Sequence, residues 1–118
     1  MSKITTLCLN VDFRRAYYKG RCYVSPALIT YVRKNKLKIN RIGITTSKKT
    51  GIAVKRNRAR RIIRSAYTCI CSELEQGYDI VFVARAKTAE LKSGDILLMM
   101  QHHLADAGIL NNLKTDKQ

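Results

Sequence analysis

A run of basic residues between Lys55 and Arg64 constrains this chain more than any other feature. Six of these ten residues are Lys or Arg and none is acidic. Apolar residues recur through and beyond the run at helical spacing, which predicts an α-helix from about Val54 to Glu75. The side expected to be buried consists of Ala59, Ile62, Ile63, Ala66, Cys69, Ile70 and Leu74.

The opposite side of this predicted helix is cationic. It carries Asn57, Arg60, Arg61 and Arg64, with Arg56 and Arg58 at its margins. A face that only served solubility would normally mix acids with the bases at i,i+4, yet the first acid here is Glu73. Arginine grips phosphate with two parallel hydrogen bonds and also stacks on bases. The pattern therefore favours a surface for a polyanion over a merely solvated face.

Charge is distributed unevenly along the whole chain. The formal net charge is +15; residues 1–64 contain 18 basic residues and one acid (+17), and residues 65–118 contain 5 basic and 7 acidic residues (−2). Such asymmetry indicates one face for nucleic acid. An anionic membrane is the competing polyanion, but it would favour large apolar residues beside the charge, and the arginine helix needs its apolar stripe for the core.

Length and composition limit the class of protein. A chain of 118 residues is expected to form one domain. No segment approaches the roughly 20 apolar residues of a transmembrane helix, and residues 1–10 lack the apolar run of a signal peptide. We therefore expect a cytoplasmic protein with reduced cysteines. Its four cysteines, which have no C-x-x-C spacing and so predict no zinc site, are Cys8, Cys22, Cys69 and Cys71.

The remaining pattern predicts an α+β domain. Pro26 is expected at an edge position or bulge near the start of the first β segment, and residues 111–118 are expected to form a frayed tail. The last helix should turn Ile96, Met100, His103 and Ala107 inward. The predicted segments are a helix over 10–19, β structure over 22–33, a basic turn at 35–38, a strand over 41–47, the arginine helix ending at Gly77, a buried central strand over 78–84, and a helix over 92–107.

No catalytic group is evident in the sequence. A two-metal nuclease needs converging carboxylates, whereas the aspartates lie on different predicted elements without a recognisable grouping. These are Asp12, Asp79, Asp95 and Asp106. His102 and His103 are adjacent on one helix, so their side chains diverge, one to the core and one to solvent. The polypeptide alone is therefore not expected to make or break bonds, and no catalytic residue or metal ligand is predicted.

Three aromatic residues are placed to form a groove. Phe13 and Tyr17 share one face of the first helix at i,i+4, and Tyr31 lies on one side of the following strand. Bases of a single strand can stack on such rings, with about 1–3 kcal/mol for each base. The alternative is that the rings only fix the helix to the core, which is the simpler interpretation for Phe13.

The segment RIGITTSKKTGIAVKRNRARRIIRSAY, with its R-N-R core at Arg56–Arg58, resembles the protein subunit of bacterial ribonuclease P. The resemblance extends upstream to DFRRAYYKG and downstream to YDIVFVARAK, and it covers residues 9–105. It implies a two-layer α–β sandwich with a mixed sheet of about four strands, similar to the second domain of ribosomal protein families. It also implies a left-handed β-α-β crossover through the arginine helix, against the usual right-handed rule.

The family resemblance further implies a role in removing the 5′ leader of precursor tRNA. The catalyst is then a large RNA with bound magnesium, and the protein binds that RNA and the single-stranded leader. The leader groove maps to Phe13, Tyr17, Tyr31, Lys48 and Lys49. The surface for the catalytic RNA maps to Arg56, Asn57, Arg58, Arg60, Arg61 and Arg64.

Two other classes of protein remain open at this point. A ribosomal or ribosome-assembly protein would share the size, charge and fold but would not affect precursor cleavage. A self-sufficient nuclease would cleave without an RNA partner, and the missing carboxylate cluster argues against it. Neither a membrane nor DNA is expected as a partner.

Overall fold

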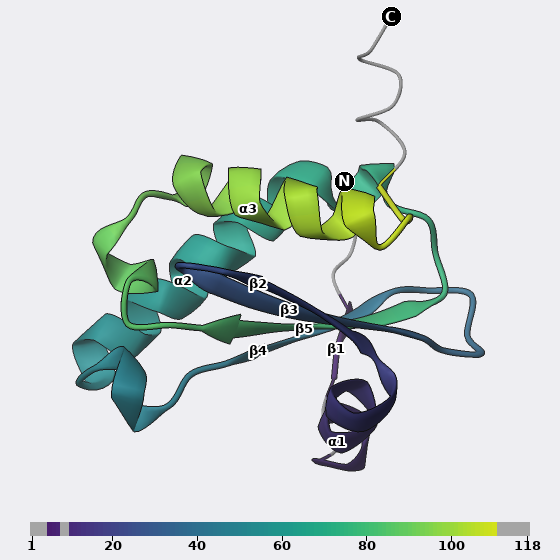
Figure 1. Cartoon of the computed structure of the whole chain (residues 1–118), viewed down its shortest axis with the longest axis horizontal. Helices are drawn as coiled ribbons and strands as arrows, with labels where there is room; N and C mark the ends of the chain where they lie inside the picture. Colours follow the sequence, from purple (N-terminus) through teal and green to yellow (C-terminus); the bar gives the residue numbers. More distant parts are fainter. Residues whose placement is uncertain (1–4, 8–9, 111–118) are drawn as a thin grey trace, which may run out of the picture.

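A mixed sheet of five strands organises the protein, with helices on both of its faces (Figure 1). The computed structural model describes residues 5–7 and 10–110; the side chain of Lys48 is not described. The elements are β1 (Thr5–Thr6), α1 (Asn10–Lys19), β2 (Arg21–Ser25), β3 (Leu28–Lys34), β4 (Arg41–Thr45), η1 (Lys48–Thr50), α2 (Ala53–Ile70), η2 (Cys71–Glu73), β5 (Tyr78–Ala84), η3 (Thr88–Glu90) and α3 (Ser93–Asp106).

The strands lie in the order β1-β4-β5-β3-β2. β4 is parallel to both β1 and β5, whereas β3 is antiparallel to both β5 and β2. β5 is thus the central strand, and most of its residues are buried, as its continuous apolar sequence predicted. α2 connects the parallel neighbours β4 and β5. The α+β class and the mixed sheet are confirmed, the strand number is five, and the handedness of the crossover stays a prediction.

The two faces of the sheet carry different layers. α2 and α3 cover one face and form the main core with β3, β4 and β5, while α1 covers part of the other face (Figure 1). On the α1 face, Ala16 packs with Leu7 and Val81, and Phe13 and Tyr31 lie against them. The buried part of α1 thereby fixes this short helix across the sheet.

The first β segment is a hairpin of two strands. β2 and β3 pair from Arg21↔Val32 to Ser25↔Leu28, so Pro26 and Ala27 form a two-residue connection. The prediction of β structure over 22–33 is confirmed, whereas Pro26 lies in the turn between the two strands and not at a bulge or an edge position. Proline sets φ for the first loop position of a turn, which is the role that Pro26 takes here.

The arginine helix is shorter than predicted. α2 ends at Ile70 and continues as the 3₁₀ turn η2, so Gly77 does not end it. Gly77 instead has φ 104° in the loop before β5. Of the predicted buried stripe, Cys69 is exposed and Ile62 is half-buried. Tyr67 is buried instead, because the buried positions are 59, 63, 66, 67 and 70. Leu74 is buried, but it lies after the helix and bridges to Leu110.

The last helix agrees with its prediction. Ile96, Met100 and His103 are buried, Leu104 joins them, and Ala107 is partly buried at the helix end. The expected frayed tail at 111–118 lies outside the described residues. Among the described helices, none is long and apolar enough to cross a membrane.

Candidate nucleic-acid interface

The buried side of α2 fixes the direction of its arginines. Ala59 and Ile63 are fully buried against the sheet and α3, which turns Arg60, Arg61 and Arg64 to solvent. α2 contains no acidic residue. In the part of the chain that the structure describes, the ion pairs involve only Arg33 and Arg41, so the charge of α2 is not compensated.

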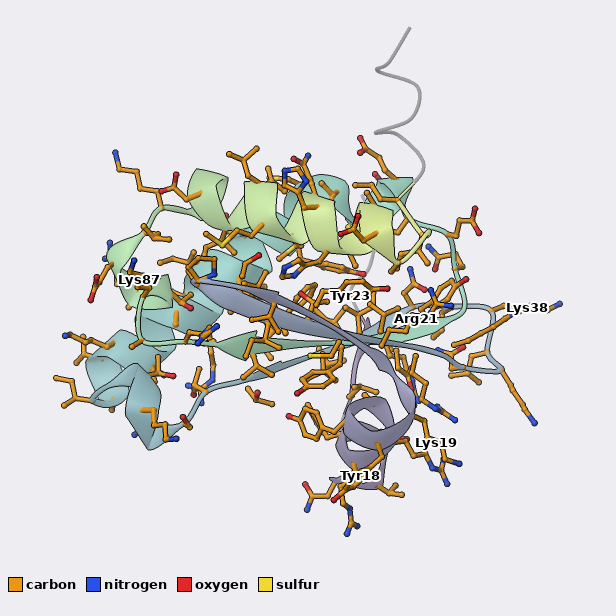
Figure 2. The ribbon with its side chains drawn as sticks, in the orientation of Figure 1. Tyr18, Lys19, Arg21, Tyr23, Lys38 and Lys87 are labelled. Carbon is orange, nitrogen blue, oxygen red and sulfur yellow. The ribbon has the colours of Figure 1, made fainter. Side chains whose placement is uncertain are left out.

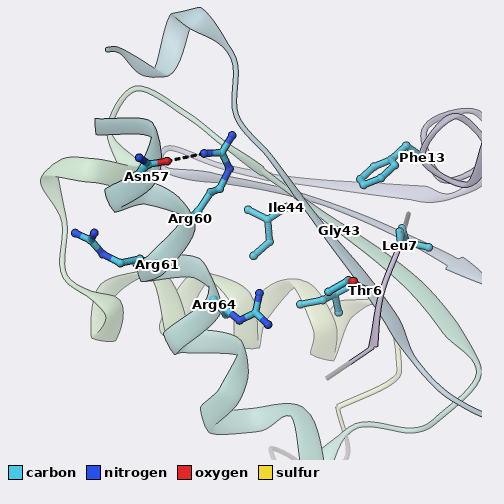
Figure 3. Close-up of a pocket in the computed structure, with 10 residues that line it drawn as sticks. Thr6, Leu7, Phe13, Gly43, Ile44, Asn57, Arg60, Arg61 and Arg64 are labelled. Atoms are coloured by element: carbon cyan, nitrogen blue, oxygen red, sulfur yellow. Dashed lines mark hydrogen bonds between the residues drawn. The ribbon is translucent and has the colours of Figure 1, made fainter. Parts of the chain in front are cut away.

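A pocket of about 580 Å³ lies between this cationic face and the edge of the sheet (Figure 3). The Arg60 guanidinium donates from Nη1 to Oδ1 of Asn57 at 2.9 Å, which orients both side chains. The pocket is lined by Thr6, Leu7, Phe13, Ile42, Gly43, Ile44, Asn57, Arg60, Arg61 and Arg64. The structure thus brings together four of the six predicted residues of the arginine helix.

The other two predicted residues lie apart from this pocket. Arg58 donates from Nε to the carbonyl oxygen of Ala89 at 2.9 Å, which joins α2 to η3. Arg56 is half-buried. Arg58 therefore has a structural contact as well as a charge.

On the other face of the sheet, Tyr17 and Tyr31 meet edge to face. Their ring centroids are 4.9 Å apart and the rings are inclined by 77°. Burial raises the pKa of Tyr31, and a hydrogen bond with the Cys22 thiol raises it further.

A second depression, of about 530 Å³, lies beside this tyrosine pair. Its lining residues are Asn10, Phe13, Arg14, Tyr17 and Thr45. The sequence interpretation missed Asn10 and Arg14, although both share one helix face with Tyr17 at i, i+4 and i+7 and could have been found by that spacing.

The predicted lysines are not part of this depression. Lys49 is exposed on η1 and lines neither hollow, and the side chain of Lys48 is not described. On the outer side of α1, Tyr18 is 84% exposed and points away from the sheet with Lys19 (Figure 2). Adjacent tyrosines therefore occupy opposite surroundings, with Tyr17 beside the groove and Tyr18 in solvent.

Phe13 connects the two hollows because it lines both. A Cβ at position 43 would collide with the Phe13 ring, so Gly43 lets the ring lie directly on β4. The ring also packs against the small cluster under α1. Phe13 thus fixes the helix, as the alternative interpretation held, and also forms a wall of each hollow.

Two of the aspartates, Asp12 and Asp79, share Arg41 as a partner. Strand register places Asp79 between Arg33 and Arg41. Arg41 donates to both carboxylate oxygens of Asp79, at 2.9 and 2.8 Å, and lies 3.5 Å from Asp12. Asn35 also donates to Asp79, at 2.8 Å. The hydrogen bond with Asp79 is the main cause that raises the pKa of Arg41. Because the buried Asp79 carboxylate is already bound by two arginines and an amide, we assign it a structural role.

The described residues contain no cluster of three or more His, Cys, Asp or Glu side chains that could bind a metal ion. His103 is buried between Ser25 and Thr30, at 2.7 and 2.8 Å, and His102 is exposed. The cysteines at 22, 69 and 71 are free thiols, and Cys8 lies outside the described residues.

Comparison with known protein families gives a match over nearly the whole chain. The family model for ribonuclease P matches residues 1–108. The ribonuclease P protein component of Clostridium botulinum is 39% identical over 103 residues, which are 86% of this chain and 93% of that protein. The corresponding protein of Dehalococcoides mccartyi is 37% identical over 118 residues, which are 100% of this chain and 95% of that protein.

Solved structures agree with this match. The ribonuclease P protein of Staphylococcus aureus superposes with a TM-score of 0.80 at 32% identity, covering 92% of this chain and all of that one. The protein from Thermotoga maritima gives a TM-score of 0.74 at 25% identity, covering 84% of this chain and 94% of that one. These relatives do not favour the alternative that the chain is a ribosomal or ribosome-assembly protein. The chain therefore belongs to the bacterial ribonuclease P protein family, the protein component of the ribonucleoprotein endonuclease that processes the 5′ end of tRNA.

Proposed function

We propose that α2 binds the catalytic RNA and that the tyrosine groove receives the single-stranded 5′ leader of precursor tRNA. The observation that carries this proposal is the wall that Phe13 forms between the arginine pocket and the depression beside Tyr17. Two surfaces of different chemistry thus adjoin each other. Each surface can bind a different RNA, so the protein holds the leader next to the catalytic RNA.

The chemistry of each surface matches its RNA. Guanidinium groups without carboxylate partners suit the phosphates of a folded RNA, because each contact releases counterions. Aromatic rings beside Arg14 suit a single strand, because every base has a face that can stack whatever its sequence. We assign Arg56, Arg58 and Lys49 to the periphery of these surfaces, where they add positive charge.

In this proposal the protein contributes binding and the RNA performs the reaction. Magnesium belongs to the RNA-containing holoenzyme, and the protein raises substrate affinity and supports metal binding near the scissile phosphate. The Asp12–Arg41–Asp79 group is neutralised within the fold and serves stability. The holoenzyme acts in the cytoplasm, where precursor tRNA is made.

Reconstitution tests the proposal directly. Precursor tRNA is incubated at low magnesium with the protein, with the catalytic RNA, or with both. We expect efficient cleavage at the leader junction only with both, and none with the protein alone. Cleavage by the protein alone, or no effect of the protein on the RNA, would contradict the proposed division of roles.

A further inference from the structure

We propose that the pocket between α2 and the edge of β4 receives one unstacked base of the catalytic RNA, with Arg60 and Arg64 on its flanking phosphates. This inference rests on the proposed binding of that RNA to α2. It adds a subsite of defined chemistry, in which a nucleobase enters the protein.

The floor of the pocket is apolar. Leu7 and Ile42 are 7% and 1% exposed, and the half-buried side chains of Phe13 and Ile44 complete the surface. Proteins that bind unpaired RNA commonly splay a base out of its stack and place it on aromatic or apolar side chains. A site for phosphate alone would not need such a floor.

The opposite wall is cationic and comes entirely from α2. Arg60 and Arg64 extend from the helix toward the strands, whereas Arg61 extends away from them (Figure 3). Asn57 holds the Arg60 guanidinium at 2.9 Å. Arginine can bind phosphate and also stack on a base. The pocket therefore combines partners for both parts of a nucleotide, and an uncharged apolar ligand would leave the guanidinium groups unused.

Backbone groups of β4 also lie beside the pocket, which Gly43 and Ile44 line. The N–H of Leu7 donates to the Ile42 carbonyl at 2.8 Å, so this carbonyl points to the edge of β4 that faces β1. Backbone groups alternate along a strand, so the N–H and C=O of Ile44 point to the same edge.

The location of the pocket indicates which of the two RNAs supplies the base. The pocket lies on the α2 side of Phe13, and the tyrosine pair lies on the α1 side. Every charged lining residue belongs to α2, the element assigned to the catalytic RNA. The base is therefore assigned to the catalytic RNA, and a leader base in this pocket would be a contrary result.

Two substitutions at Ile44 test the proposal, because they change the apolar floor of the pocket without changing the net charge. Ile44→Phe occupies the pocket, and Ile44→Thr keeps a β-branched residue while making the floor more polar. Val24→Phe is the matched control, because Val24 is 61% exposed on the opposite edge strand β2. Affinity for the catalytic RNA alone is measured over a range of salt concentrations, with thermal melting to verify folding.

We expect Ile44→Phe to weaken binding of the catalytic RNA at least tenfold with an unchanged salt slope, because the arginines still reach the same phosphates. Ile44→Thr should weaken binding several-fold, and Val24→Phe should bind as the parent protein does. Chemical probing of the RNA should show one unpaired base whose footprint is present with the parent protein and absent with Ile44→Phe.

Three results separate the possible failures. If both Ile44 variants are folded and bind within twofold of the parent, while replacement of the α2 arginines weakens binding, the pocket is empty and only this inference fails. If replacement of the arginines also has no effect, the proposed binding of catalytic RNA by α2 fails. If Ile44→Phe weakens only the binding of leader-bearing precursor to the holoenzyme, the occupant is the leader and the assignment is overturned.

Discussion

At the scale of single residues, the buried carboxylate of Asp79 depends on a partner from each neighbouring strand. Arg41→Ala removes its two shortest hydrogen bonds with a cation and also the partner of Asp12. We expect a decrease of about 3 kcal/mol in the free energy of unfolding, because the buried carboxylate loses its nearest cation and keeps only Asn35 and the more distant Arg33 as partners. Denaturant unfolding measures the decrease. Arg33→Ala is the control, because its 3.6 Å separation from Asp79 is longer and its removal should cost less.

His103 should make stability depend on pH. Its ring is buried, and burial lowers its pKa in the folded protein. The unfolded chain then binds a proton more readily than the folded one, so His103 contributes its full stability above a pKa of about 6.5. That contribution is lost as the pH falls through the lower pKa of the folded state.

Melting temperatures at pH 7.5 and pH 5 test this expectation. His103→Gln should be less stable than the parent at pH 7.5 and should lose less on acidification. The exposed neighbour provides the control, since His102→Gln should keep the parent's pH dependence. An equal loss on acidification in the parent and in His103→Gln would show that other groups cause it.

At the scale of elements, the central prediction concerns the cationic face of α2. The triple replacement Arg60→Ala, Arg61→Ala and Arg64→Ala should preserve the fold, because these positions are exposed and alanine favours a helix. Affinity for the catalytic RNA should fall, and the slope of log affinity against log salt should flatten by about 0.7–0.9 for each phosphate that the variant no longer neutralises.

The matched control removes the same charge elsewhere. Lys34→Ala, Lys36→Ala and Lys38→Ala together also lower the net charge by three, but these lysines lie at the end of β3 and in the loop before β4, where Lys38 points away from the body of the protein (Figure 2). Their replacement should change binding less. Equal effects of the two triple variants would mean that net charge, and not the α2 face, determines affinity.

Elements with strong local signals were predicted well from the sequence. β5 follows from its continuous apolar run, and the start of α2 and most of its buried stripe follow from helical spacing. The end of α2 could not be found in this way, because Leu74 continues the apolar pattern after the helix has become a 3₁₀ turn. β1 is only two residues long, and its pairing with β4 depends on tertiary packing, so periodicity gives no sign of it.

At the scale of the whole molecule, the sequence predicts which residues form the site better than it predicts how they are arranged. The arginine face and the three aromatic rings are evident from composition and spacing. The pocket floor is not, because Leu7 and Ile42 line the same pocket as the α2 arginines only after β1 has joined the sheet. The contact of Asp12 with Arg41 has the same origin, since strand register and the position of α1 bring distant residues together.

The division of the molecule into two RNA surfaces is the central claim, and one affinity difference tests it most directly. The reconstituted holoenzyme is titrated with precursor tRNA and with mature tRNA, which lacks the leader. Tyr17→Ala and Tyr31→Ala should each weaken binding of the precursor by about 1–3 kcal/mol and leave binding of mature tRNA unchanged, because only the leader stacks on these rings.

Tyr18→Ala is the control in the same experiment, because this neighbouring tyrosine is exposed on the outer side of α1. It should not change the affinity for either RNA, and all three variants should still bind the catalytic RNA. The account predicts a selective loss for the leader-bearing RNA with Tyr17→Ala and Tyr31→Ala. Equal losses for precursor and mature tRNA, accompanied by a lower melting temperature, would contradict it.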